Sequence, residues 1–118
     1  MNEDLFKERT KQLGIQILQL ADHMPRSISA DALARQIVRS GTSIGANYRA
    51  ACRAKSTADM IYKLKIVEEE GDETAYWLEI CAEMGYLPQG KIAQIAKETD
   101  EILAMTVASI KTLRARKA

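Results

Sequence analysis

Apolar residues recur along the chain at alternating steps of three and four positions, the spacing that places side chains on one face of an α-helix. Four such runs are present, separated by turn-forming residues, and they cover roughly residues 6–20, 33–51, 60–82 and 92–113. Ala, Leu, Ile, Glu, Lys and Arg dominate the composition, which favours helices over sheets. The pattern therefore predicts an all-α protein built from four amphipathic helices.

Turn and capping residues set the predicted boundaries of these helices. A turn around Pro25 is followed by Ser29, which we expect to be the N-cap of the second helix. This helix is expected to loosen around residues 40–43, where Ser, Gly and Thr follow one another. Ser56, or the threonine after it, is the expected cap of the third helix, and Gly85 is expected to close it.

The short connections favour an antiparallel up-down four-helix bundle. In this topology the turn positions determine which residues of neighbouring helices lie at the same level, to within about one helical turn. Gly71 is then expected opposite the Ser-Gly pair at residues 40–41, where small residues would let the second and third helices approach closely. Arg39 is expected near Asp72 and Glu73, as an ion pair between the same two helices.

The composition is that of a soluble globular protein, with 47% hydrophobic and 28% charged residues over 118 positions. This length predicts a single domain spanning residues 1–118. No apolar run approaches the roughly 20 residues that cross a bilayer, and residues 1–4 carry the wrong charge for a signal peptide. We therefore expect a cytoplasmic protein that does not enter membranes. Cys52 and Cys81 are too few for a disulfide framework and are expected far apart, as free thiols.

Charge is distributed unevenly, although the formal net charge is only +1. Residues 26–56 contain six Arg or Lys and one acid, whereas residues 57–87 contain two Lys and eight acids. An up-down bundle brings four segments to one end: the start of helix one, the end of helix two, the start of helix three and the end of helix four. These segments, residues 3–11, 49–55, 57–65 and 109–118, together hold eight more bases than acids, and we call this end the basic pole.

Clusters of Lys and Arg attract phosphate backbones, so the basic pole predicts salt-sensitive binding of RNA or single-stranded DNA. Tyr62 and Tyr48 are the few aromatic candidates for base stacking, which predicts weak sequence specificity. Alternatively, the pole is a solvated set of helix ends whose cations complement the helix dipoles. The side chains expected to contact phosphates are Arg49, Arg53, Lys55, Lys63, Lys65, Lys111 and Arg114.

The third helix has more apolar positions than one bundle can bury. Tyr76, Trp77 and Ile80 lie off its main apolar stripe, as do Ile61 and Ile66. A second apolar face predicts a partner helix, with Tyr76, Trp77 and Ile80 in an interface between copies of the chain. The alternative is a wide core face with partly exposed aromatic side chains.

Two long segments carry a resemblance to a known family. Residues 40–56 (SGTSIGANYRAACRAKS) and 63–79 (KLKIVEEEGDETAYWLE) resemble the bacterial four-helix-bundle proteins named for intervening sequences in 23S ribosomal RNA genes. The resemblance extends over roughly residues 10–115. Many members have Glu-Gly where this chain has Ala50-Ala51, so it is most similar to the branch that reads Ala-Asn-Tyr-Arg.

The resemblance implies an up-down four-helix bundle that assembles into a ring-like homopentamer. A relative in this family is the accessory protein of diversity-generating retroelements, a basic pentameric barrel that binds reverse transcriptase and nucleic acid. Nucleic acid and reverse transcriptase are therefore the implied partners. A scaffold that only binds protein, docking an acidic partner such as a polymerase on the basic pole, is the second class of function.

An enzyme is the third class. Glu70 with Glu73, and Glu98 with Glu101, are similar to the paired acidic motifs that hold Mg²⁺ in all-helical nucleotide pyrophosphatases. However, Glu98 and Glu101 lie off the apolar stripe of the fourth helix. His23, the only histidine, is not in a Glu-x-x-His motif, and the chain has no Gly-rich phosphate loop. We therefore expect no catalytic residues, no metal, no cofactor and no small-molecule substrate.

Overall fold

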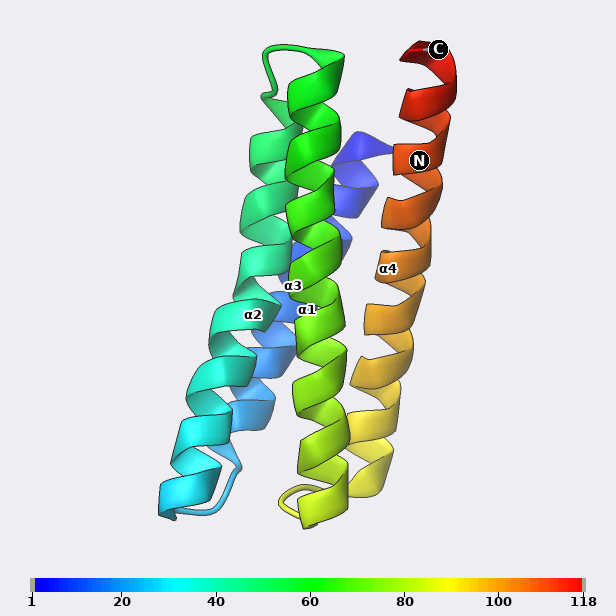
Figure 1. The fold of residues 1–118 in the computed structure, drawn as a ribbon. Coiled ribbons are helices and arrows are strands. Elements are labelled where there is room, and N and C mark those ends of the chain that lie inside the picture. The colour runs from blue at the N-terminus through cyan, green and yellow to red at the C-terminus, as the bar shows by residue number, and fades with distance from the viewer. Residues whose placement is uncertain (1, 118) are drawn as a thin grey trace.

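The computed structural model describes residues 2–117, without the side chain of Lys117, and within this range the chain forms four α-helices. They are α1 (Glu3–Asp22), α2 (Ile28–Cys52), α3 (Thr57–Met84) and α4 (Gln89–Lys117). Successive helices run in opposite directions and form an elongated bundle of 49 × 21 × 21 Å (Figure 1). The predicted all-α, antiparallel four-helix bundle is confirmed.

The helix ends show how short polar residues begin and end each element. Ser27, in an extended conformation, accepts a hydrogen bond from the Ala30 N–H at 3.1 Å, so Ser27 is the N-cap of α2. The prediction of Ser29 was wrong by two residues. Ser29 already lies in the first turn of α2, and its hydroxyl is instead 2.5 Å from the Tyr86 hydroxyl.

The ends of α3 confirm the sequence prediction. Ser56 caps α3 by accepting from the Asp59 N–H at 3.0 Å. Gly85 follows α3 with φ at 68°, in the left-handed region that glycine adopts without strain, and its N–H donates to the Ala82 carbonyl. Within the described part of the chain, no helix combines the length and apolar character needed to cross a membrane.

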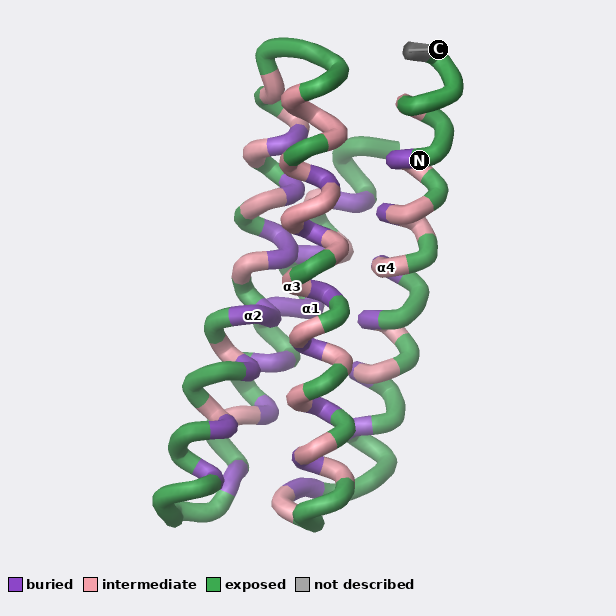
Figure 2. Tube along the Cα trace, in the orientation of Figure 1, coloured by how far each residue is buried: buried purple, intermediate pink, exposed green. Residues whose placement is uncertain are grey.

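The core follows the predicted apolar stripes of all four helices (Figure 2). At its upper end Phe6 and Tyr48 make an edge-to-face contact with ring centroids 4.6 Å apart. Buried hydroxyls are satisfied locally: Thr74 donates to the Glu70 carbonyl at 2.8 Å and lies 3.0 Å from the Ser40 hydroxyl. Among the described residues no buried side-chain polar atom lacks a hydrogen-bond partner.

α2 is continuous through residues 40–43, so the predicted loosening was wrong. The hydroxyls of Thr42 and Ser43 donate to carbonyls one turn back, at 2.7 and 2.6 Å, and so remain compatible with the helix. Gly41 is tightly packed because a Cβ there would lie 2.5 Å from Ile17 Cδ1. Gly41 therefore allows the close approach of α1, rather than of α3.

Gly71 also faces a different helix from the one predicted. It is level with the Ser40 region, since Ser40 contacts Thr74, but a Cβ on Gly71 would lie 2.7 Å from Leu103 Cδ2 on α4. Gly71 therefore lies at the predicted height along the bundle, to within one turn, but it faces α4 rather than α2. The reason is that each successive residue turns the side chain by roughly 100° around the helix axis, so an error of one residue in the register changes the neighbouring helix that a side chain faces.

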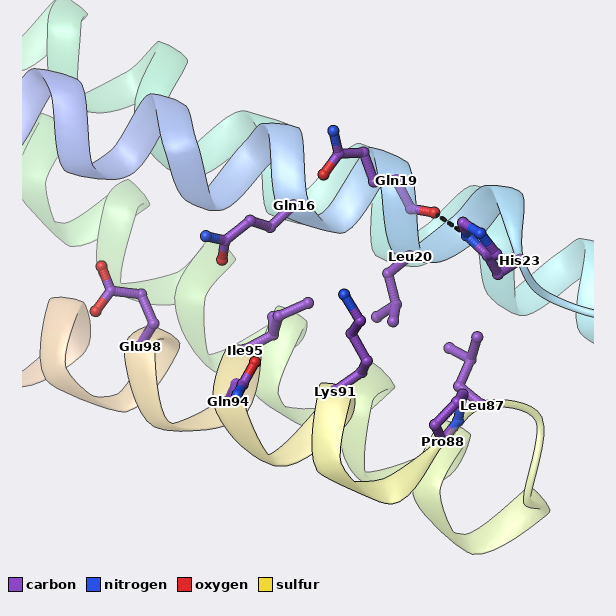
Figure 3. Close-up of a pocket in the computed structure, with 10 residues that line it drawn as sticks. All are labelled: Gln16, Gln19, Leu20, His23, Leu87, Pro88, Lys91, Gln94, Ile95 and Glu98. Carbon is purple, nitrogen blue, oxygen red and sulfur yellow. Dashed lines mark hydrogen bonds between the residues drawn. The ribbon is translucent and has the colours of Figure 1, made fainter.

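The α1–α4 seam is the least extensively packed of the four helix pairs. Arg9 crosses it, donating to Glu98 through two nitrogens at 2.7 Å each and to Glu101 at 2.8 Å. Below this contact the seam opens into a groove of about 770 Å³, in which Lys91 points from α4 toward Leu20 (Figure 3). The groove is lined by Gln16, Gln19, Leu20, His23, Leu87, Pro88, Lys91, Gln94, Ile95 and Glu98.

Candidate nucleic-acid interface

The topology brings the segments of the predicted basic pole to the same end of the molecule. The start of α1, the turn between α2 and α3, and the end of α4 all lie at the top of the bundle in Figure 1. The last turns of α4 extend beyond the start of α1 (Figure 1), because Arg9 near the start of α1 is already level with Glu101. The end of α4 therefore extends past α1 and lies at the same end of the bundle as the α2–α3 turn.

Five of the seven predicted phosphate-binding side chains are exposed at this end. Arg49 and Arg53 lie at the end of α2 and Lys55 in the turn that follows, and Lys111 and Arg114 lie near the end of α4. Among residues 2–117 none of these five makes an ion pair within 4 Å. Their charge is available to an external anion. The side chain of Lys117, also counted in the predicted pole, lies outside the described residues.

The two other predicted side chains are partly buried and already engaged within α3. Lys63 pairs with Asp59 at 3.1 Å, one turn back, and Lys65 pairs with Glu68 at 3.2 Å. The hydrogen bond from Lys63 lowers the pKa of Asp59, and the Lys55 backbone N–H adds to this effect. We therefore expect Lys63 and Lys65 to contribute less to anion binding than the five exposed cations.

The polar and aromatic residues near the pole differ in what they can offer. Tyr62 is exposed and can stack on a base, whereas Tyr48 is buried in the core and cannot. Burial also raises the pKa of Tyr48, with the adjacent Cys52 contributing. Asn47 donates to the Ser43 carbonyl at 2.8 Å, so its amide is engaged within α2.

A shallow hollow beside Arg49 was not predicted from the sequence. It has a volume of about 310 Å³ and lies between α1 and α2, where Gly14 and Gly45 let the two helices approach closely, since a Cβ on Gly45 would lie 3.3 Å from Thr10 Oγ1. Lys11 borders it and pairs with Glu8 at 3.1 Å, an interaction that lowers the pKa of Glu8. The two glycines are visible in the sequence, but only the packing of α1 against α2 shows that both border the same hollow.

The predicted interface residues on α3 have different surroundings. Tyr76 is exposed, whereas Trp77 and Ile80 are partly buried and pack against the core. The Trp77 indole N–H donates to Glu73 at 3.2 Å, and its ring lies 5.0 Å from that of Tyr76. This part of α3 thus presents one free aromatic ring beside two anchored apolar side chains.

The paired glutamates are held by arginines from neighbouring helices. Arg39 pairs with Glu73 and, at 3.3 Å, with Glu70, so its partners include only one of the two predicted acids. Arg9 pairs with Glu98 and Glu101, and the hydrogen bond to Glu98 is the main cause of a raised Arg9 pKa. These ion pairs occupy the carboxylates that a metal would need. In the described range no group of three or more acidic, His or Cys side chains could hold a metal ion.

The two cysteines and the single histidine are the remaining side chains with reactive groups. Cys52 and Cys81 are both free, as predicted. Burial raises the pKa of the Cys81 thiol to about 11, and burial followed by the neighbouring Glu3 raises that of Cys52. His23 is the exposed C-cap of α1, and its Nδ1 lies 2.8 Å from the Gln19 carbonyl oxygen.

Comparison with known proteins places the bundle in a family. A crystal structure of a protein of unknown function from the S23 ribosomal protein family of Bacteroides thetaiotaomicron VPI-5482 matches with a TM-score of 0.86 and 34% sequence identity, covering 94% of this chain and 99% of that chain. No protein of curated function matches. The family model described as 23S rRNA-intervening sequence protein matches residues 5–108. The chain therefore belongs to the family of 23S rRNA-intervening sequence proteins.

Proposed function

We propose that this protein is a non-enzymatic, cytoplasmic, oligomeric bundle that binds single-stranded RNA or DNA through its basic pole. The observation that carries the proposal is the group of five exposed cations that make no ion pair with the described residues, contributed by α2, the α2–α3 turn and α4. Phosphates exchange their counterions for such cations, which provides affinity without sequence information. Tyr62 adds one exposed ring for stacking.

The oligomer is part of the proposal because it increases the number of cations that one nucleic-acid strand can contact. Five cations on one subunit would neutralise few phosphates, whereas adjacent poles in a ring would form one extended basic surface. A homopentamer is the state that the resemblance to this family implies. Measuring the native mass of the purified protein tests it independently of any ligand.

Binding of a fluorescent single-stranded RNA oligonucleotide, and of DNA of the same sequence, against salt concentration tests the proposed ligand. Five phosphate contacts predict a logarithmic salt slope of roughly −3 to −4 for each subunit engaged. The variant K55Q/K111Q/R114Q removes three cations of the pole, and we expect a slope lower in magnitude by roughly 2. The proposal is wrong if the wild type shows no salt-dependent binding near micromolar affinity.

A matched control removes the same charge from the opposite end of the bundle. Arg26 lies in the α1–α2 turn, and Lys91 and Lys97 lie near the start of α4, all exposed. The variant R26Q/K91Q/K97Q therefore has the same net charge as the pole variant. If binding depends on the pole, this control keeps the wild-type slope to within the loss of one contact. Equal effects of both variants would indicate binding through net charge alone.

The second candidate function is a scaffold that binds only protein, such as a reverse transcriptase. The scarcity of exposed aromatic rings at the pole favours it, since Tyr48 is buried and only Tyr62 can stack. Affinity capture from the native host with and without nuclease distinguishes the two functions. A partner protein retained after nuclease treatment, together with no binding to the oligonucleotides, would support the scaffold.

A further inference from the structure

The groove between α1 and α4 has the size of a small-molecule site. Its volume of about 770 Å³ lies within the range of roughly 300–1,000 Å³ that such sites occupy. The groove forms where the least extensively packed pair of helices meets. It lies where α1 ends and α4 begins, at the end of the bundle opposite the basic pole (Figure 1).

The floor of the α1–α4 groove is aliphatic. It consists of Leu20, Leu87 and Ile95, each 6% exposed, with Pro88 beside Leu87 (Figure 3). None of the ten described residues that line the groove is Phe, Tyr or Trp, so there is no large ring on which a nucleobase could stack. An aliphatic chain gains free energy from burial alone, and it therefore suits this floor better than a flat aromatic molecule.

One cation points into the groove without a partner. Lys91 extends from α4 toward Leu20 (Figure 3), and it makes no ion pair with any residue from 2 to 117. The acid that lines the groove, Glu98, is held by two nitrogens of Arg9 at 2.7 Å each. An ammonium group above an apolar floor, with the nearby carboxylate already engaged, favours an anion supplied from outside the chain.

The rim of the groove can add hydrogen bonds to such an anion. Gln16 extends from α1 into the space between the helices, and Gln19 and Gln94 also line the groove (Figure 3). Among the ten lining residues, all within the described range, one hydrogen bond is present, between His23 Nδ1 and the Gln19 carbonyl oxygen at 2.8 Å. The three side-chain amides are therefore able to donate to a carboxylate. One unpaired cation matches a single negative charge better than a phosphate group, which carries between about 1.5 and 2.

We propose that the α1–α4 groove binds a straight-chain aliphatic carboxylate, of the class of medium-chain fatty acids. The carboxylate lies on Lys91, and the chain lies on the floor formed by Leu20, Leu87 and Ile95. Such a ligand joins the two helices where they pack least, so its binding stabilises the folded bundle. The inference goes beyond the proposed function and is independent of it, because the groove and the basic pole lie at opposite ends of the molecule.

Calorimetric titration of the full chain, purified free of lipid, with octanoate, decanoate and dodecanoate tests the ligand. We expect one molecule to bind per chain, with affinity rising roughly fivefold or more for each added pair of methylene groups, because each buried methylene contributes to binding. Dodecyltrimethylammonium carries a chain of the same length with the opposite charge, and it should bind at least roughly tenfold more weakly than dodecanoate. Thermal unfolding should move to higher temperature with dodecanoate.

Variants of one lysine test where the carboxylate lies. Lys91→Gln should weaken decanoate binding by roughly tenfold, whereas Lys91→Arg keeps the charge and should retain most of the affinity. Lys97→Gln is the matched control, since it removes the same charge from an exposed residue of α4 that does not line the groove. Circular dichroism verifies the fold of each variant. In methyl NMR spectra of the wild type, the signals of Leu20, Leu87 and Ile95 should shift when decanoate binds.

Several results would overturn the proposal. They are the absence of saturable carboxylate binding, an ammonium compound that binds as tightly as dodecanoate, and equal affinities of the Lys91→Gln and Lys97→Gln variants. Methyl shifts confined to residues outside the groove would place the ligand elsewhere and have the same effect. Binding to vesicles of an anionic phospholipid, with none to the free acids, would make this surface a membrane contact instead. A chain that binds decanoate but no RNA leaves the groove site standing and contradicts only the proposed function.

Discussion

Single glycines act as spacers at the tightest places in this bundle. At Gly41 the obstacle to a side chain is Ile17, which is completely buried and cannot move without displacing the core. At Gly71 the obstacle is Leu103, which is only partly buried and can turn away. Gly90, in the first turn of α4, is not a spacer, because a Cβ there would meet no atom within 4 Å. The same residue type thus has three different structural roles.

These differences predict an order of stability for three alanine variants. A helix gains about 1 kcal/mol when alanine replaces glycine, whereas overpacking a core costs about 1–3 kcal/mol. We expect Gly41→Ala to be destabilised by about 1–2 kcal/mol net, Gly71→Ala to change little, and Gly90→Ala to be stabilised by up to about 1 kcal/mol. Urea unfolding monitored by circular dichroism gives all three. A Gly41→Ala variant as stable as Gly90→Ala would contradict the packing described for Ile17.

At the scale of the elements, most of the bundle could be predicted because helix ends and apolar stripes are local signals. Ser56 and Gly85 were identified correctly, since a capping hydroxyl and a left-handed glycine act within a few residues. The predicted cap of α2, Ser29, was two residues too late, because both serines precede the apolar run and only the extended backbone of Ser27 identifies it as the cap. The loosening at residues 40–43 was wrong because helix propensity ignores the α1 packing that favours Gly41 there.

The two serines at the start of α2 give a direct test of the cap. Ser27→Ala leaves the Ala30 N–H without its acceptor, and we expect a loss of about 1 kcal/mol of unfolding free energy. Ser29→Ala removes only a hydrogen bond between exposed hydroxyls, and we expect a loss of about 0.5 kcal/mol or less. Thermal and urea unfolding of both variants provide the comparison. Equal losses would indicate that Ser29 contributes to the cap after all.

At the scale of the whole molecule, the up-down order of the helices determines the basic pole. The pole could be predicted from sequence because topology alone brings the ends of α2 and α4 together. The sequence could not predict which cations of the pole are unpaired, because the pairing of Lys63 with Asp59 depends on side-chain conformation. The open α1–α4 seam and its Arg9 contact were also beyond prediction, because Arg9 is nearly ninety residues from Glu98 and one arginine among many.

Arg9 is the polar contact that holds α4 to α1, so its loss should affect that seam before the rest of the bundle. The Arg9 and Glu98 side chains are each about one-third exposed, and after screening by solvent we expect Arg9→Met to cost about 1 kcal/mol. Methionine keeps the apolar stem, so packing at this position is largely preserved. Hydrogen exchange should become faster in α4 and α1 near the contact, with α2 and α3 unchanged. Lys97→Met, an equal loss of charge at an exposed site of α4, is the control. Uniformly faster exchange in all four helices would mean that the bundle unfolds as one unit and that the α1–α4 seam has no separate stability.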